Sequence, residues 1–389
     1  MAREFAFRMR YANVQSAAIG LLRLPLAVLV VMHHACPDVV ALADAPFPLL
    51  SSRGMLNAFC ILCSNVIGLI AVACFFMISG FLFFQNIPRW NFTRWQGKMQ
   101  RRGRTLALPY ILWNLLPFAF CLLYGYLGYL RSGLPDSIPG DMRDANLYRI
   151  LWDWARWGGE VKNIFGLPIY NSGPYDGPLW FMRDLLVVTA LSPLIYVLVR
   201  YLRVWGLGLL FVCMYLHLWP QLPGFSAYSA FYFAAGACFA VHRRSIIAFA
   251  LHMRPALYAL ALPMCLASVY FNCEATQVGL WIYPLFQLAG VFIMFILAAR
   301  MVRRGHRPIK TLAPAAFFIY AFHSVALIPY RGTNLTIITN ALRTLFGPTT
   351  AGIFATYVMS VILSVGISLT LYILLRCTLP RAARLLTGR

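Results

Sequence analysis

Apolar stretches of about twenty residues recur along this chain from one end to the other, and they limit its possible folds more than any other feature. A helix of that length crosses the roughly 30 Å of hydrocarbon in a bilayer. Hydrophobic residues make up 61% of the 389 residues and charged residues 11%, whereas soluble proteins average about 45–50% and about 25%. The sequence therefore predicts an all-α, polytopic membrane bundle, and residues 1–389 are expected to form a single transmembrane domain.

The apolar runs predict about ten transmembrane helices. Their expected ranges are 13–36, 59–84, 106–130, 178–199, 204–219, 226–241, 250–270, 278–299, 311–329 and 351–375. Lys and Arg gather in alternate connections and at both ends of the chain, whereas Asp and Glu lie mostly in the other connections. The positive-inside rule places the basic connections and both termini in the cytoplasm. The net charge of +22 therefore reflects topology, and no nucleic acid partner is expected.

The long connection at about 131–177 is predicted to lie outside and mixes both charges with several tryptophans. Long external loops are often functional. Aromatic rings beside carboxylates and amides are suited to stacking on a sugar. The segment "WDWARWGG" is equally consistent with an interfacial helix that lies among the lipid headgroups.

The first predicted span carries Arg23 and His34, eleven residues apart. At about 3.6 residues per turn they project from one face, whereas His33 points elsewhere. An ionisable side chain inside a bilayer usually faces the protein interior or a water-filled cavity. We expect Arg23 near the middle of the bilayer and His34 toward the outer end of the span. In the alternative without a functional role, the Arg23 side chain snorkels to the membrane surface and His34 lies at the interface.

Two stretches on or near the next predicted spans each allow a ligand-binding interpretation and a structural one. Ser79-Gly80 in "FFMISGFLFF" leaves room for another backbone or a narrow ligand, although ordinary helix packing explains it equally well. Arg101 and Arg104 in "KMQRRGRTLALPYILWN" share a helical face at the predicted cytoplasmic entrance. Guanidinium groups bind phosphate oxygens bidentately, and plain positive-inside charge is the alternative.

Two later stretches place further polar groups within predicted spans. Arg183-Asp184 in "GPLWFMRDLLVV" lies near the outer end of a predicted span. The two residues either form a structural ion pair, or Asp184 orients the imidazole of His34. Asp38, one turn beyond His34, is another candidate for that orienting role. His323 in "AAFFIYAFHSVAL" is either a helix–helix contact or part of a site.

Taken in this order, these stretches resemble the acyltransferase-3 family of bacterial membrane acyltransferases over nearly the whole chain. The branch that acts on polysaccharides and surface glycans is the most similar, through "RRGRTLALPYILWN" and "GPLWFMRDLL". Where many members have Trp-Ser-Leu-x-x-Glu, this chain has "LWFMRDL", which brings Asp184 one residue closer to Trp180. The family's Arg-x10-His, FFxxSG and RxxR patterns fall on Arg23 and His34, on Phe75, Phe76, Ser79 and Gly80, and on Arg101 and Arg104.

The resemblance implies an enzyme of the bacterial cytoplasmic (inner) membrane that transfers an acyl group, usually acetyl, from cytoplasmic acetyl-CoA. The acceptor is a hydroxyl of an envelope glycan or lipid-linked sugar at the outer face. His34 is expected as general base, with Arg23 and Asp184 as the other catalytic residues. Binding roles are expected for Arg101, Arg104, Ser79 and Gly80 toward acetyl-CoA and for Trp180, Arg183 and His323 toward the acceptor.

Membrane lipid is the remaining expected partner, and no metal site is expected. Two rival functions stay open. The first is transfer of succinyl or another acyl group by the same mechanism. The second is a transporter or flippase for an anionic glycolipid, with Arg23, Asp184 and His323 along the path, although the two halves of the chain show no convincing repeat. Neither the acceptor sugar nor the oligomeric state follows from the sequence.

Overall fold

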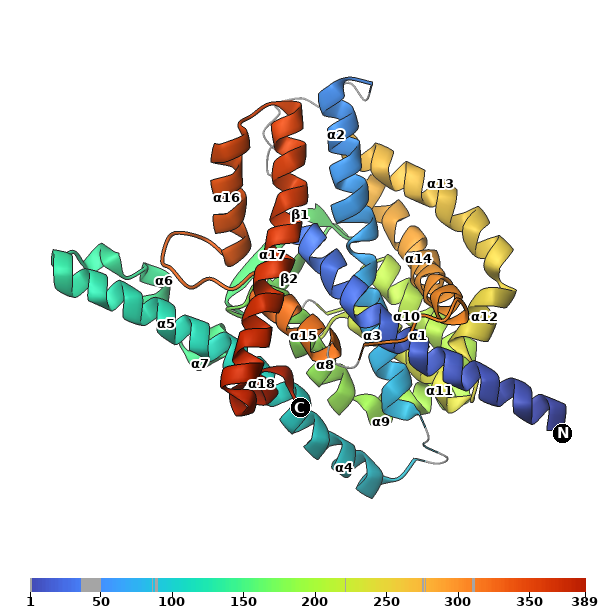
Figure 1. Cartoon of the computed structure of the whole chain (residues 1–389). Coiled ribbons are helices and arrows are strands. Elements are labelled where there is room, and N and C mark those ends of the chain that lie inside the picture. Colours follow the sequence, from blue (N-terminus) through green and yellow to red (C-terminus); the bar gives the residue numbers. More distant parts are fainter. Residues whose placement is uncertain are drawn as a thin grey trace. The chain divides into compact units, whose positions relative to one another are not determined.

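The computed structural model describes residues 2–35, 50–85, 87, 90–220, 222–274, 276, 278–309 and 312–389 (Figure 1). For residues 2–12, 160 and 161 it describes the backbone alone. The first half contains α1 Ala2–His34, α2 Ser52–Ile61, η2 Leu62–Ile67, α3 Ile70–Phe84, α4 Phe92–Arg102, η3 Gly103–Ala107, α5 Leu108–Ser132, η4 Pro135–Ser137, α6 Gly140–Arg143, α7 Leu147–Trp152, β1 Ala155–Lys162, β2 Pro168–Gly173, η5 Gly177–Leu179 and α8 Trp180–Ala190. The second half contains α9 Ser192–Val197, η6 Leu198–Leu202, α10 Arg203–Tyr215, α11 Ala227–Val241, α12 Ile246–His252, α13 Arg254–Cys273, α14 Val278–Arg303, α15 Leu312–Phe322, α16 Asn334–Phe346, α17 Thr350–Thr378 and α18 Pro380–Thr387.

The predicted class, a polytopic helical membrane protein, is confirmed. Among the described residues, 7 helical segments are long and apolar enough to cross a membrane. The number rises to 8 if α11 and α12, which meet at a bend of 100°, form one broken span. The sequence predicted about ten spans, and the difference arises where two predicted spans are not single long helices.

The predicted span at 178–199 divides in two. Its first helix, α8, ends at Ala190, and α9 begins at Ser192. Pro193 follows at the second position of α9, and a proline has no N–H to continue the hydrogen-bond ladder of a preceding helix. With its 11 residues α8 is about 16 Å long, too short to cross the hydrocarbon.

The predicted span at 311–329 contains only α15, which ends at Phe322. The Asn334 side chain donates a hydrogen bond to the Phe322 carbonyl (3.0 Å), and the backbone N–H of Leu335 donates to the His323 carbonyl (3.1 Å). These bonds satisfy the carbonyls that a helix end leaves open, so the chain turns here into α16.

The chain forms two compact units. Unit 1 comprises Met1–Trp90, Ser192–Tyr215 and Ala230–Ala316. Within it, α1 packs against α3 and α14, and α13 packs against α14 (Figure 1). The α3 sequence is apolar on every side, which is typical of a helix surrounded by protein, and most of its side chains are buried.

Unit 2 comprises Asn91–Leu191, Leu216–Ser229 and Phe317–Arg389. Its long helix α5 follows directly on α4 through the π-helical turn η3. Near its start α5 contacts the C-terminal helix α18, where the Trp113 indole donates to the Leu386 carbonyl (2.9 Å). Helices α16 and α17 pack against each other as a hairpin (Figure 1).

The connection at 131–177 folds into short helices followed by an antiparallel β-hairpin. Strand β1 pairs with β2, with Trp157 opposite Asn171 and Gly158 opposite Tyr170. The expectation of an interfacial helix at "WDWARWGG" is therefore wrong for the residues from Ala155 onward, which form β1. Gly158 and Gly159 have positive φ angles, which disfavour a continuous helix there.

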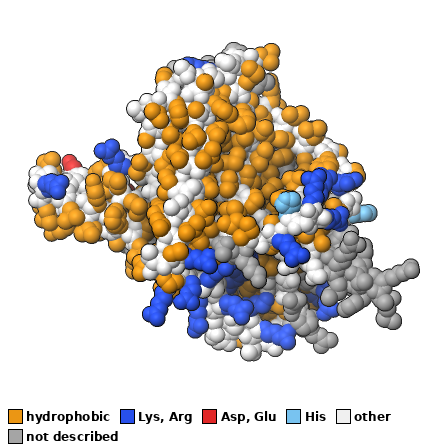
Figure 2. Space-filling view, in the orientation of Figure 1, with side chains coloured by type: hydrophobic (Ala, Val, Ile, Leu, Met, Phe, Trp, Pro, Cys, Tyr) orange, Lys and Arg blue, Asp and Glu red, His pale blue; other side chains and the backbone are white. Residues whose placement is uncertain are grey.

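The surface of the described chain supports a membrane location. Hydrophobic side chains cover much of the face seen in Figure 2. On α5 the exposed side chains at 116, 120, 123, 127 and 130 are all Leu or Phe, and their spacing of three and four places them on one stripe of the helix. Soluble proteins rarely expose such patches, so this stripe is suited to lipid.

Candidate active site

Helix α1 carries both polar residues of the first predicted motif. It is continuous from Ala2 to His34 and includes Pro25, so the eleven-residue spacing of Arg23 and His34 is helical throughout. The Arg23 side chain is half-buried and that of His34 is exposed. Arg23 and His34 therefore lie on one face of α1, as expected from their spacing. Their catalytic roles remain predictions.

His33 and His34 are not equivalent, as the sequence predicted. The His33 Nδ1 donates to the Ser64 carbonyl (3.0 Å), and the Ser64 hydroxyl donates to the Met32 carbonyl (2.6 Å). These bonds tie the end of α1 to the π-helical turn η2. His33 is thereby committed to holding two segments of unit 1 together, with its ring 4.9 Å from that of His34.

Gly80 provides a close contact between α3 and α11 in unit 1. A Cβ atom at Gly80 would lie 2.0 Å from the Phe233 carbonyl oxygen, and one at Gly236 would lie 1.9 Å from the Met77 carbonyl oxygen. Two glycines therefore let two backbones touch, which is the packing alternative considered for Ser79-Gly80. Ser79 is half-buried beside it, and contact of this pair with acetyl-CoA remains a prediction.

Arg101 and Arg104 are both exposed and lie on either side of a change in helix type. Arg101 is in the last turn of α4, and Arg104 is in the π-helical segment η3. A π-helix bonds each residue to the fifth residue along, so the i, i+3 alignment predicted for an α-helix holds only as far as Arg102. Exposed guanidinium groups remain available for phosphate, so the predicted role in acetyl-CoA binding stands untested.

Arg183 and Asp184 form a buried ion pair at the start of α8, with Nη2 to Oδ1 at 2.9 Å. The guanidinium also donates to the Trp152 carbonyl (2.6 Å) and to the carbonyl and hydroxyl of Ser172 (both 3.0 Å). The other carboxylate oxygen of Asp184 accepts from the Ser226 hydroxyl (2.5 Å). The pair therefore joins α8, α7, the β-hairpin and the segment before α11.

These contacts bear on the roles predicted for the pair. Each N–H of Arg183 has a protein partner, and both oxygens of Asp184 have one as well. This is the pattern of the structural ion pair that the sequence left open. Roles in acceptor binding and in orienting His34 remain predictions, and the alternative orienting residue Asp38 lies outside the described residues.

Trp180 and His323 are further predicted site residues of unit 2. Trp180 is half-buried, with its ring 6.2 Å from that of Tyr228. His323 follows the last residue of α15 and is fully buried, and its Nδ1 donates to the Tyr320 carbonyl (2.6 Å). The bond to Tyr320 helps to end α15.

The structure thus distributes the predicted residues over both units. Unit 1 holds Arg23, His34, Ser79 and Gly80, and unit 2 holds Arg101, Arg104, Trp180, Arg183, Asp184 and His323. Of these, Arg183 and Asp184 are in direct contact. Ser226, Ser172 and Trp152, which complete their surroundings, were not predicted, because nothing in the local sequence shows that they converge on α8.

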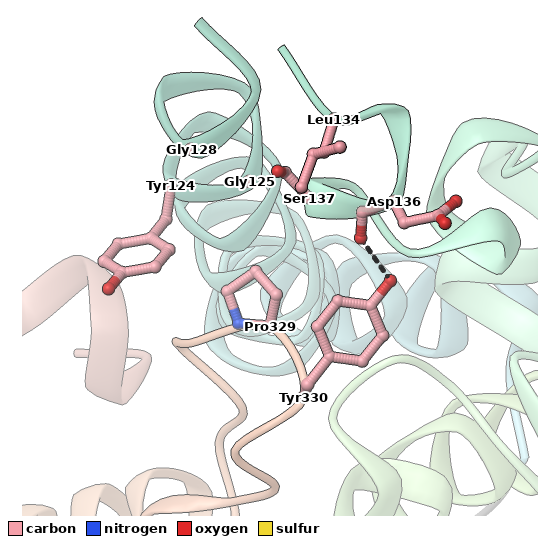
Figure 3. A pocket seen from close by; sticks show the side chains of 8 residues that line it. All are labelled: Tyr124, Gly125, Gly128, Leu134, Asp136, Ser137, Pro329 and Tyr330. Atoms are coloured by element: carbon pink, nitrogen blue, oxygen red, sulfur yellow. Dashed lines mark hydrogen bonds between the residues drawn. The ribbon is translucent and has the colours of Figure 1, made fainter. Parts of the chain in front are cut away.

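A surface hollow of about 380 Å³ lies beside the C-terminal half of α5 in unit 2 (Figure 3). The Tyr330 hydroxyl donates to the Asp136 carbonyl (2.8 Å) and fixes one wall. Its lining comprises Tyr124, Gly125, Gly128, Leu134, Asp136, Ser137, Pro329 and Tyr330. The hollow offers tyrosine rings to a ligand but includes none of the predicted site residues.

Comparison with known proteins places all the predicted site residues within one family domain. A family model described as an acyltransferase domain, acyltransferase 3, matches residues 16–372, which include every predicted site residue. The chain belongs to the acyltransferase-3 family. The resemblance seen in the sequence is therefore confirmed, and the apolar helices agree with a multi-pass membrane member.

One curated relative of this acyltransferase-3 protein is the succinoglycan biosynthesis protein ExoH of Rhizobium meliloti (strain 1021). The two are 30% identical over 200 residues, which is 51% of this chain and 47% of the relative. The chain thus spans about half the length of that relative. No solved structure matches the chain.

Proposed function

We propose that the protein is a membrane O-acyltransferase that moves an acetyl group from cytoplasmic acetyl-CoA to a hydroxyl of an envelope glycan at the outer face of the inner membrane. The observation that carries the proposal is the family match, which extends from before Arg23 to beyond His323. The relative named for succinoglycan biosynthesis supports a polysaccharide acceptor.

The donor side of the proposal rests on α4 and η3. Arg101 and Arg104 are exposed there on the side predicted to be cytoplasmic. Acetyl-CoA carries phosphate groups, and exposed guanidinium groups bind phosphate with little rearrangement. Removing both charges should therefore weaken binding of acetyl-CoA.

The acceptor side rests on the connection at 131–177. The β-hairpin exposes the rings of Trp157 and Tyr170, and the hollow beside α5 exposes those of Tyr124 and Tyr330. Amphipathic rings of this kind offer an apolar face to a sugar and a polar edge to its hydroxyl groups. The hairpin and Tyr330 lie in connections predicted to be external, whereas Tyr124 lies in the predicted span at 106–130.

The proposed reaction needs one base. His34 takes the proton from the acceptor hydroxyl while that oxygen attacks the thioester carbon. The carbon–sulfur bond then breaks, and the departing thiolate of CoA receives the proton from the imidazolium. The products are the acylated sugar and free CoA, and the imidazole returns to its neutral form.

A purified sample in lipid nanodiscs tests the proposal. Labelled acetyl-CoA is supplied with oligosaccharide fragments of de-acylated bacterial exopolysaccharides, and label on the sugar is measured together with free CoA. His34→Ala should lower turnover by about 10²–10⁴-fold, the usual contribution of a general base. His33→Ala is the matched control and should keep most of its turnover.

Undiminished turnover in folded His34→Ala would contradict the assignment of the base. Absence of label on every acceptor, together with transbilayer movement of glycolipid in the absence of acyl-CoA, would favour a flippase.

Transfer of a succinyl group is the second candidate, because the relative takes part in succinoglycan biosynthesis. The same assay with succinyl-CoA separates the two donors. A higher kcat/KM for succinyl-CoA would assign that acyl group. Additional basic side chains near the thioester would then have to accommodate the extra carboxylate.

A further inference from the structure

Asp176 is the most anomalous polar residue in the described chain. It follows the β-hairpin and immediately precedes η5 and α8. Its side chain is 1% exposed, and neither carboxyl oxygen has a hydrogen-bond partner among the described residues. Buried polar groups almost always have a partner, so this carboxyl requires an explanation.

The backbone of Asp176 is held firmly in place. Its N–H donates to the side-chain oxygen of Asn114 (2.9 Å), and its carbonyl accepts from the N–H of Leu179 (2.9 Å). Asn114 is itself fully buried and donates to the Tyr110 carbonyl (2.8 Å). The position of the carboxyl is therefore determined by α5 and η5 together.

The polar neighbours of Asp176 already have other partners. Tyr110 and Tyr320 are both close enough to interact electrostatically with Asp176 and with Asp184. Nevertheless the Tyr110 hydroxyl donates to the Leu151 carbonyl, and the Tyr320 hydroxyl donates to the Pro178 carbonyl. Arg183 is fully used by Asp184 and two backbone segments. Among the described residues, donors therefore reach the carboxyl of Asp184 and none reaches that of Asp176.

Burial raises the pKa of Asp176 well above its usual range, which favours the neutral carboxylic acid over the carboxylate. In that form it offers one O–H donor and a carbonyl acceptor. A hydroxyl group of a ligand also donates and accepts one hydrogen bond each, so the two groups match.

The backbone next to Asp176 is open on one side. A Cβ atom added to Gly177, the next residue, would meet no atom within 4 Å other than those of its chain neighbours. The hairpin that ends three residues before Asp176 carries the exposed aromatic rings of Trp157 and Tyr170. Exposed aromatic rings therefore precede Asp176 in the chain, and a residue with open space beside it follows.

We propose that Asp176 is a substrate-binding residue whose carboxyl exchanges hydrogen bonds with a sugar hydroxyl, which supplies the partner that the protein does not. This inference rests on the proposed function for the identity of the ligand as a glycan. The Arg183–Asp184 pair, by contrast, positions the hairpin and α8 around this carboxyl.

Binding of the oligosaccharide fragments to purified protein without acyl-CoA tests the inference directly. Asp176→Leu removes both hydrogen bonds at similar bulk and should weaken binding about tenfold. Asp176→Asn keeps a donor and an acceptor and should restore binding to within a few-fold. Asp144→Asn, an exposed residue of the same connection, is the matched control and should bind like the wild type.

A folded Asp176→Leu protein that binds every fragment with wild-type affinity would overturn the inference. If the leucine variant does not fold, Asp176→Ala provides the same comparison. The proposed function fails separately, if wild-type protein binds the fragments but transfers no acyl group to them.

Thermal stability without ligand gives a second readout. The unfolded carboxyl titrates near 3.8 and the folded one at higher pH, so between these values the folded state binds more protons and its stability falls as pH rises. The wild type should therefore lose melting temperature relative to Asp176→Asn as the pH rises above about 4. Equal pH dependence would show that the carboxyl is not buried as proposed.

The comparison is designed around the other groups that face Asp176. These are Tyr110 from α5, Tyr320 from α15 and Tyr175 beside it in the chain. All are present in both proteins, so their titration cancels in the difference between the two melting temperatures.

Discussion

At the scale of single residues, Arg183 shows how much structure one buried cation can organise. It contacts a carboxylate on its own helix, a carbonyl at the end of α7 and a serine of β2. A charge removed from water is tolerated only when its hydrogen bonds are complete. The three segments must therefore converge before the pair can be buried.

Arg183→Ala should destabilise the protein by about 3–5 kcal/mol, because it leaves the Asp184 carboxylate buried without its cation. Thermal unfolding in detergent measures this loss. The double variant Arg183→Met with Asp184→Leu should recover most of the stability, because no uncompensated charge remains.

The matched control for this prediction is Arg143→Ala. Arg143 also forms an ion pair, with Asp136, but the two side chains are 47% and 96% exposed, so its loss should cost at most about 1 kcal/mol. Equal effects of Arg183→Ala and Arg143→Ala would contradict the structural role of the buried pair.

At the scale of elements, glycines set how closely α3 and α11 approach. Gly80 and Gly236 each face a backbone carbonyl of the other helix. Backbone atoms cannot move aside as a flexible side chain can, so a methyl group at either position forces the helices apart.

Gly80→Ala should lower stability by about 1–3 kcal/mol, measured by thermal unfolding. Gly97→Ala on α4 is the control, because a Cβ atom there would meet nothing within 4 Å and alanine favours a helix. If Gly80→Ala unfolded like the wild type and only weakened acetyl-CoA binding, Gly80 would serve the ligand and not the packing.

The π-helical turn η3 determines how Arg101 and Arg104 lie relative to each other on the helix surface. It lies between α4 and α5 and contains Arg104. Arg101→Ala with Arg104→Ala should raise the KM for acetyl-CoA several-fold and reduce its salt dependence, because two screened charges are lost. The control is Arg131→Ala with Arg143→Ala. Arg131 is an exposed cation in the last turn of α5 and Arg143 one beyond it, so their loss should leave that KM unchanged.

At the scale of the whole molecule, the distribution of charge predicts orientation. Basic connections stay on the cytoplasmic side when the chain inserts into the membrane. This rule predicts that both termini lie inside and the β-hairpin outside. A green fluorescent protein fused after Arg389 should therefore fluoresce. Alkaline phosphatase inserted at Gly166, in the exposed turn between β1 and β2, should be active.

The opposite pattern, an active phosphatase at the C-terminus and an inactive one in the hairpin, would reverse the orientation. It would also place Arg101 and Arg104 on the side without acyl-CoA and contradict their proposed role.

The sequence alone determined the class of the protein, its family and the helix that carries Arg23 and His34. Hydropathy and helical spacing are properties of neighbouring residues, so they survive in any arrangement of the helices. The number of spans was less certain, because the hydrogen bond of Asn334 that closes α15 comes from a residue outside the apolar run.

Only the tertiary structure decided which buried polar groups have partners. Asp176 and Asp184 both belong to one short polar and aromatic stretch of the sequence. The partners of Asp184 include Ser226, 42 residues away, and the position of Asp176 is fixed by Asn114, 62 residues away. Whether a buried carboxyl is satisfied depends on what distant segments bring to it, because a hydrogen bond requires its two atoms within about 3 Å in space and places no limit on their separation along the chain.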